Sequence, residues 1–227
     1  MNFMNRILIL TKTGFAAATL TASVAALAVT NWSVGDFLDG TSPTTLAAQN
    51  ISAWSTGGTT DGSLRGACIH NYGSSGYGIV NLRESNPCSG DPNMGPHAAD
   101  NVGGVDLFQL TFASKVDLES VRIGWNGTDD FGKDSDISVL AYTGPATATT
   151  PSLSGKTLAQ LLTSGWSLVG HYGNVGSNTN PDNTAKITSN ISSSWWLVSA
   201  YSSNYGTSVA EQYQTCKNSS GTRACSQ

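Results

Sequence analysis

The feature that most constrains the fold of this chain is an alternation of apolar side chains within residues 101–144. The alternation occurs in three runs: Phe108, Leu110, Phe112; Val121, Ile123, Trp125; and Ile137, Val139, Ala141. Asp106, Gln109 and Thr111 interrupt the apolar pattern around the first run. Neighbouring side chains of a strand point to opposite faces, so such runs are typical of antiparallel strands with one face on a core and one in water. We therefore expect three strands joined by two turns.

Further strand-like runs lie on both sides of this stretch, at residues 51–54, 64–71, 77–83, 166–172, 184–190 and 195–201. The glycines within residues 73–76 favour a hairpin between two of these runs. One run has helical spacing instead, because Thr157 and Gln160 match a capping box and Gly165 can end the helix. The sequence predicts an all-β fold: a single antiparallel β-sandwich of jelly-roll type, with one short helix at about 156–164 and long Gly/Ser/Asn loops.

The composition excludes one class of partner. Charged residues make up 11% of the chain, against about a quarter in an average protein, and the net charge is −4. Nucleic-acid binding needs a basic stripe, so we expect no nucleic-acid partner. A surface of hydroxyls and amides is common in secreted β proteins.

Residues 1–28 have the features of a secretory signal peptide. Arg6 and Lys12 supply positive charge, an apolar run follows, and Ala26-Leu27-Ala28 has the form of a cleavage site. A retained membrane anchor is the alternative, although Thr and Ser interrupt the apolar run. After cleavage we expect an irregular arm at 29–62, the β-sandwich domain at 63–205, a polar segment at 206–227 and no membrane span.

All four cysteines, Cys68, Cys88, Cys216 and Cys225, lie beyond this leader. An even number of cysteines in an exported chain indicates disulfides, with three connectivities open to four cysteines. We predict the pairing of sequence neighbours, Cys68–Cys88 and Cys216–Cys225. A zinc site is the alternative, but the sequence has no C-x-x-C or His–Cys spacing to support it.

Several motifs follow one another in a fixed order. They are Ala99-Asp-Asn101, Asp106-Leu-Phe108, Arg122-Ile-Gly-Trp125, the stretch from Asp134 to Gly144, the stretch from Leu158 to Gly170, and Trp195-Trp-Leu-Val-Ser-Ala-Tyr201. This order resembles the exosortase-dependent (PEP-CTERM class) surface proteins of Gram-negative bacteria, over about residues 98–205. The resemblance implies export, association with the cell surface or matrix, and no known enzymatic activity. Proteins of this class end in a Val-Pro-Glu-Pro-like motif, an apolar helix and a basic cluster, and this sorting tail is absent between Cys216 and Gln227.

An acidic turn is the strongest candidate for a metal site. Asp129, Asp130, Asp134 and Asp136 lie within eight residues, with Gly132 and Ser135 between them and Gly127 just before them. A carboxylate-rich glycine loop can supply the oxygen ligands that Ca²⁺ prefers, although the spacing is not that of an EF-hand. The alternative is a solvated turn in which aspartates cap the backbone. Calcium is the one cofactor that the sequence suggests.

Aromatic residues provide a candidate ligand surface. Trp195, Trp196 and Tyr201 lie on one predicted strand, so one tryptophan is expected in the core and the other outside, where it can stack on a sugar ring or lie under a loop. His70, His97 and His171 have no catalytic or metal-binding spacing and are expected in strands or loops.

Together these features predict a secreted, non-enzymatic protein of the bacterial cell surface or extracellular matrix, with a structural or adhesive role. Extracellular polysaccharide or other surface proteins are the expected partners. The alternative functions are a carbohydrate-binding module or a polysaccharide-active hydrolase. A hydrolase needs paired acids across a cleft, which an exposed turn of aspartates does not resemble.

Overall fold

The structure is a computed structural model of the whole chain. It describes residues 5–8, 30–32, 48–57, 62–72, 77–81, 98–101, 104–124, 128–129, 132–133, 135–147, 149–175, 183–206, 215–218 and 221–224. Side chains are described within these ranges from residue 50 to residue 206, apart from residues 128–129 and 132–133.

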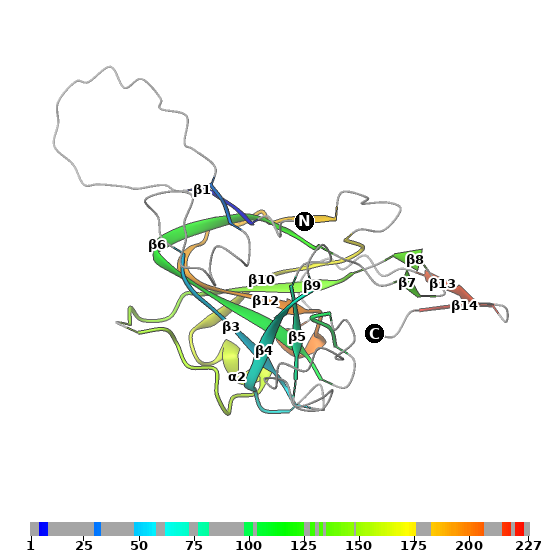
Figure 1. Ribbon diagram of the computed structural model, residues 1–227, viewed down its shortest axis with the longest axis horizontal. Coiled ribbons are helices and arrows are strands. Elements are labelled where there is room, and N and C mark those ends of the chain that lie inside the picture. Colours follow the sequence, from blue (N-terminus) through cyan, green and yellow to red (C-terminus); the bar gives the residue numbers. More distant parts are fainter. Residues whose placement is uncertain are drawn as a thin grey trace, which may run out of the picture.

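The fold is organised around β6 (Asp106–Arg122), a strand of 17 residues that curves through the middle of one large antiparallel sheet (Figure 1). The first half of β6 pairs with β3 (Ala48–Ser55) on one side and with β12 (Ser192–Ala200) on the other. Its second half pairs with β1 (Asn5–Leu8) and β11 (Thr184–Lys186). Part of the predicted signal peptide thus forms a strand on the edge of β6.

The remaining strands extend the sheet on both sides of β6. Its order is β10 (Trp166–Tyr172), β9 (Ile137–Tyr142), β12, β6, β3, β4 (Arg65–Asn71) and β5 (Tyr77–Val80), while β2 (Thr30–Trp32) pairs with β1. Two separate hairpins are formed by β7 (Thr128–Asp129) with β8 (Gly132–Lys133) and by β13 (Thr215–Asn218) with β14 (Gly221–Ala224). The described helices are α2 (Leu158–Leu162) and the 3-10 turn η2 (Ser203–Tyr205).

Several local predictions are confirmed. The fold is mostly β and antiparallel, β4 and β5 form the predicted hairpin, and β10 has the predicted bounds. The helix is shorter than predicted, but its capping box is present. The Thr157 hydroxyl accepts from the backbone N–H of Gln160 at 3.2 Å, and the Gln160 side chain accepts from the Thr157 N–H at 2.9 Å. Local side-chain chemistry therefore determines where this helix begins.

The prediction of a turn between the first two central strands is wrong, because β6 continues through residues 113–120. This segment lacks glycine and proline and keeps its alternation at Val116 and Leu118, both of which are buried. A bulge takes the place of the turn. Trp195 pairs with Thr111 while Ser193 pairs with Val116, so β6 has three more residues than β12 over this interval. Bulges of this kind bend a strand without ending it.

For the first half of β6, the prediction that one face contacts water is also wrong, because Asp106, Gln109 and Thr111 are all buried, whereas Ala113 and Lys115 in the second half are exposed. The larger core, here called the inner core, is built on Ile51, Phe108, Leu110, Val139 and Trp196 and includes Val116, Leu118 and Val121 from the second half of β6. The outer core covers the opposite face of the sheet. It contains Leu64, Val105, Leu107, Leu140, Leu153, Leu158, Leu161, Trp166, Leu197, Ala200 and Tyr205.

The outer face is covered by the segment that leads into α2. Gln109 holds this segment to the sheet: its amide nitrogen donates to the Pro151 carbonyl at 2.8 Å, and its amide oxygen accepts from the Trp54 indole at 3.1 Å. Leu153 then enters the outer core, and the side chains of Thr111 and Thr150 form a hydrogen bond. Gln109 can therefore be buried although it is polar, because its amide is hydrogen-bonded to the segment that covers the sheet.

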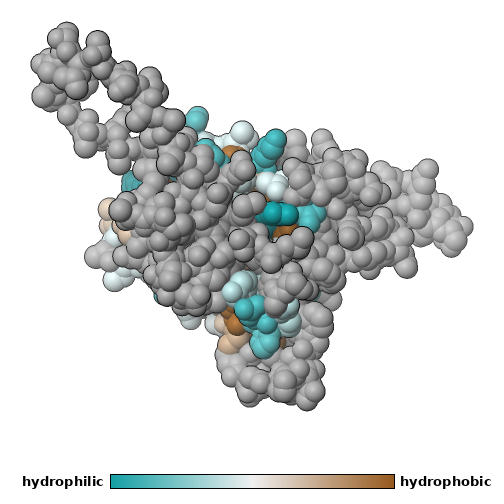
Figure 2. Space-filling view, turned by 45° about the horizontal axis from the view of Figure 1, so that its top comes forward, coloured by the Kyte–Doolittle hydropathy of each residue, from teal (hydrophilic) through white to brown (hydrophobic). Residues whose placement is uncertain are grey.

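Among the described residues, Leu162 is the only exposed large hydrophobic side chain. On the face that Figure 2 shows, hydrophilic residues border small hydrophobic areas. No helix in the described part of the chain is long and apolar enough to cross a membrane.

Candidate functional site

The two adjacent tryptophans of β12 lie on opposite faces of the sheet. Trp196 is fully buried in the inner core, where its indole donates to the Ser193 carbonyl at 3.0 Å. Trp195 is partly exposed beside the outer core, and its indole nitrogen has no hydrogen-bond partner within the described residues. Of the two, only Trp195 has surface that a sugar ring can reach.

Trp195 belongs to a cluster of three aromatic rings. The Tyr142 ring meets Trp195 edge-to-face at 5.5 Å between ring centroids and meets Trp166 at 5.4 Å. Gly144 and Gly165 lie against the Tyr142 ring. Such packing holds the partly exposed rings in one orientation, as a surface for stacking requires.

Tyr201, the third predicted aromatic residue, lies in different surroundings. Its ring meets His171 edge-to-face at 5.0 Å, and its backbone N–H donates to the Asp136 carbonyl at 3.0 Å. The side-chain amide of Asn101 donates to the Tyr201 carbonyl at 3.2 Å. The structure therefore places Trp195, Trp196 and Tyr201 in three separate environments.

A serine and a histidine that sequence reasoning did not connect form a buried pair. The register places His171 of β10 directly opposite Ser138 of β9. His171 Nε2 lies 2.8 Å from the Gly206 carbonyl, which can only accept, so Nε2 carries the proton and Nδ1 accepts from the Ser138 hydroxyl at 2.8 Å. His171 is 4% exposed and Ser138 0%, so the pair is enclosed and ties β9 and β10 to the end of η2.

Tyr205, the last residue of η2, packs in the outer core. Its ring is buried, and its hydroxyl donates to the Ser199 hydroxyl at 3.2 Å. Burial raises the pKa of the Tyr205 phenol, and the hydrogen bond to Ser199 offsets only part of that rise.

The acidic turn is described only in part. The backbone of Asp129 lies in the β7–β8 hairpin, Asp130 and Asp134 lie outside the described residues, and Asp136 immediately precedes β9. Asp136 Oδ1 accepts from the backbone N–H of Asn174 at 2.7 Å, where Asn174 has a left-handed φ of 59°. One of the four aspartates thus stabilises the loop after β10. No group of three or more potential metal ligands occurs among the described residues, and the calcium site stays a prediction.

If the acidic turn binds calcium, millimolar calcium should raise the melting temperature of the protein. An ion that binds only the folded state adds about 2.7 kcal/mol of stability at a hundredfold excess over Kd, and extracellular sites bind at about 10⁻⁴–10⁻³ M. Thermal melts with and without calcium measure this shift. Asp134→Asn should abolish it, while Asp117→Asn, which removes a carboxylate from β6, should leave it unchanged. A wild-type melt that is insensitive to about 10 mM calcium contradicts the site.

The cysteines are also described in part. Cys68 on β4 is disulfide-bonded, but no cysteine pair lies wholly within the residues whose side chains are described. In the β13–β14 hairpin Cys216 pairs with Arg223, two positions before Cys225 in the sequence. Both predicted pairings stay predictions.

Peptide mapping without reduction should recover two cross-linked peptides, Cys68–Cys88 and Cys216–Cys225. Each bond closes a short loop and is expected to contribute about 3 kcal/mol by restricting the unfolded chain. Mapping after reduction and alkylation is the control. A Cys68–Cys216 peptide would show that the pairing is wrong.

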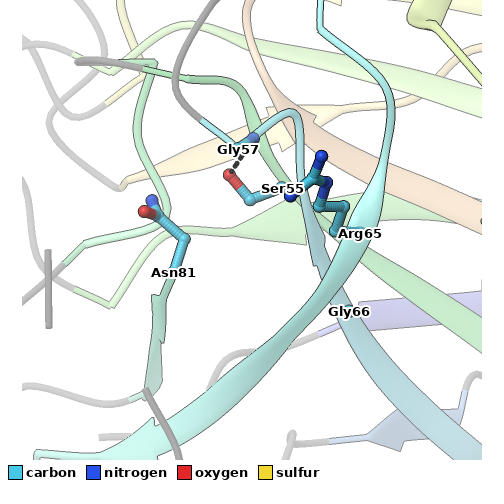
Figure 3. A pocket seen from close by; sticks show the side chains of 5 residues that line it. All are labelled: Ser55, Gly57, Arg65, Gly66 and Asn81. Carbon is cyan, nitrogen blue, oxygen red and sulfur yellow. Dashed lines mark hydrogen bonds between the residues drawn. The ribbon is translucent and has the colours of Figure 1, made fainter. Parts of the chain in front are cut away.

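A shallow polar pocket opens where β3, β4 and β5 meet. It is lined by Ser55, Gly57, Arg65, Gly66 and Asn81 (Figure 3). The pocket has room for about one water molecule. No motif in the sequence indicates this pocket, because Arg65 and Ser55 become neighbours only through the pairing of β3 with β4.

No protein-family model matches this chain, and no curated protein or solved structure matches it. The resemblance to exosortase-dependent surface proteins therefore stays a prediction from the order of the motifs.

Proposed function

We propose that this chain is a secreted, non-enzymatic protein of the bacterial cell surface or extracellular matrix, with a structural or adhesive role. The observation that carries the proposal is the order of motifs shared with exosortase-dependent surface proteins. The low charge and the signal-like residues 1–28 agree with export.

The places of these motifs in the fold support the comparison. They lie mainly on β6, β12, β9 and β10 and on α2, and these four strands are consecutive neighbours in the sheet. Motifs that are separate in the sequence thus form one continuous half of the sheet. A resemblance that follows a structural unit is more specific than one scattered over a surface.

We also propose that the sheet is arranged as a sandwich of jelly-roll type. The inner core supports this arrangement, since Val116, Leu118 and Val121 from the second half of β6 share one cluster with Phe108 and Leu110 from its first half. A strand that bends at a bulge can bring its two halves face to face.

Localisation in the native bacterium tests the proposed role. An epitope-tagged full chain should be found in the extracellular or surface fraction, should be degraded when intact cells are treated with protease, and should co-purify with the extracellular polymer. A variant lacking residues 2–28 should stay in the cytoplasm. Retention of the full chain in the cytoplasm would contradict the proposal, as would secretion without affinity for the cell surface or polymer.

Carbohydrate binding is the second candidate function, and the partly exposed Trp195 in its aromatic cluster favours it. In a glycan array, Trp195→Ala should lower binding by at least about tenfold, since the loss of one stacked ring is worth about 0.5–1.5 kcal/mol beyond its buried area. Thr188→Ala, at an exposed position before β12, is the matched control. Equal binding by both variants would exclude Trp195 from the contact.

A further inference from the structure

The polar pocket of Ser55, Gly57, Arg65, Gly66 and Asn81 combines one cation with neutral hydrogen-bonding groups. Arg65 is exposed, and its guanidinium has no ion-pair or side-chain hydrogen-bond partner within the described residues. Its aliphatic chain lies along Gly57, at 3.7 Å from the position that a Cβ on Gly57 would take. The guanidinium therefore lies at the pocket, and none of its donors is taken up by another described side chain.

Hydrogen bonds hold the two neutral polar side chains that line the pocket, Ser55 and Asn81. The Ser55 hydroxyl accepts from the Gly57 backbone N–H at 3.3 Å, and its own hydrogen has no acceptor among the described residues. The Asn81 amide nitrogen donates to Asp106 Oδ1 at 3.3 Å, and because a carboxylate accepts, this bond fixes the orientation of the amide. Figure 3 shows Ser55 and Arg65 on neighbouring strands, with Asn81 across the pocket from them.

The charges near the pocket favour an anionic ligand. In the sheet register Ser55 pairs with Asp106 on one side and with Arg65 on the other, so Arg65 and Asp106 are two strands apart. Two strand spacings amount to about 10 Å. Arg65 is the only charged residue that lines the pocket, whereas Asp106 is fully buried and its Oδ1 is occupied by the Asn81 amide. The planar fork of an arginine is suited to a carboxylate.

The shape of the pocket limits how such a ligand can bind. There is room for one small group, so the remainder of the ligand stays outside. A Cβ placed on Gly66 would have no atom within 4 Å, so the space next to the pocket above this strand is open. A uronic acid carries its carboxylate directly on a rigid ring, whereas immobilising an acidic peptide side chain costs about 0.5–1.5 kcal/mol in rotamer entropy.

We propose that this pocket binds the carboxylate of a uronic acid in an acidic extracellular polysaccharide, with Arg65 as the charged contact and Ser55 as a neutral donor. The inference rests on the proposed role at the cell surface and names the chemical class of the polymer. Each single contact is weak, and many copies of the sugar along one polymer raise the effective affinity.

The test is calorimetric titration of the full chain with trigalacturonic acid at low salt. We expect a Kd of about 1 mM, the range of a single weak contact. Arg65→Gln should raise this Kd at least about tenfold, and Arg65→Lys should raise it by less, since lysine keeps the charge and loses the fork. Arg122→Gln removes the same charge from the end of β6 and should leave the Kd within about twofold. Arg65 has no side-chain partner within the described residues, so its variants should keep the wild-type melting temperature.

Two further ligands identify the recognised group. Carboxyl-reduced trigalacturonic acid should not bind, and hexaglutamate should bind about two- to tenfold more weakly than the uronate. The inference is overturned if the wild-type protein shows no binding up to about 10 mM uronate, or if Arg65→Gln and Arg122→Gln weaken binding equally. It is also overturned if the reduced sugar binds, or if hexaglutamate binds as tightly as the uronate. If the protein is held by its native polymer and still fails these titrations, the pocket assignment fails while the proposed function stands. If the protein is never exported, the proposed function fails instead.

Discussion

Replacing Trp196 by alanine is expected to lower the free energy of unfolding by about 3–5 kcal/mol, the usual cost of deleting a large buried aromatic side chain. Trp196 is fully buried in the inner core and is among the largest fully buried side chains of the described residues. On β12 it pairs with Leu110 of β6 and with Ala141 of β9, so the cavity would open between the three central strands. Such a loss is a large part of the 5–15 kcal/mol that stabilises a typical domain.

Urea unfolding followed by far-UV circular dichroism measures this effect. Trp195→Ala is the matched control, because it removes the same side chain from the next position of the same strand, where it is partly exposed. The control should cost clearly less than Trp196→Ala. A second variant, Trp196→Phe, keeps most of the volume and should cost less than Trp196→Ala. It loses the indole bond to Ser193, worth about 0.5–1.5 kcal/mol, and a small part of the buried ring. Equal destabilisation by the two alanine variants would contradict the assignment of Trp196 to the core.

Alternation and local capping made part of this fold predictable. The opposite orientations of Trp195 and Trp196 follow from the geometry of a strand, and the start of α2 follows from the reciprocal bonds of Thr157 and Gln160. Both signals act over a few residues. They can therefore be read from the sequence without knowledge of the fold.

The continuity of β6 and the burial of Gln109 could not be predicted, because both depend on distant segments. Gln109 is buried since Pro151 and Trp54 supply its partners, 42 and 55 positions away. The bulge in β6 depends on its register with β12, which the alternation of β6 alone does not contain. The alternation predicts solvent contact for Gln109 and Thr111, whereas both side chains bind the segment that covers the outer face.

The same limit applies to the candidate sites. The Ser138–His171 pair and the row of Asp106, Ser55 and Arg65 arise from strand pairing, and no spacing in the sequence indicates either of them. The acidic turn was visible as a cluster of aspartates, yet its Asp136 accepts a hydrogen bond from the backbone of Asn174. Composition identified groups able to bind a ligand, but it could not identify the partners that already occupy them.

Gly165→Ala should be strongly destabilising for two reasons that can be separated. Gly165 has φ +94°, a conformation that costs an L-residue about 1–2 kcal/mol. A Cβ there would also lie 2.6 Å from Cε2 of Tyr142, whose ring is held by the edges of Trp166 and Trp195. Because the ring cannot move without disturbing this cluster, overpacking should add about 1–3 kcal/mol.

Gly155→Ala separates the two effects, because Gly155 has φ +76° and a Cβ there would meet no atom within 4 Å. This control should show only the backbone cost of about 1–2 kcal/mol. Repeating Gly165→Ala in a Tyr142→Ala background removes the ring contribution, so the second substitution should there keep only the backbone cost and the contact of the added Cβ with Gly144 Cα at 3.1 Å. If Gly165→Ala and Gly155→Ala destabilise the wild-type protein equally in urea unfolding, Tyr142 does not pack on Gly165. The aromatic cluster around Trp195 would then lack the rigid support on which its role as a stacking surface depends.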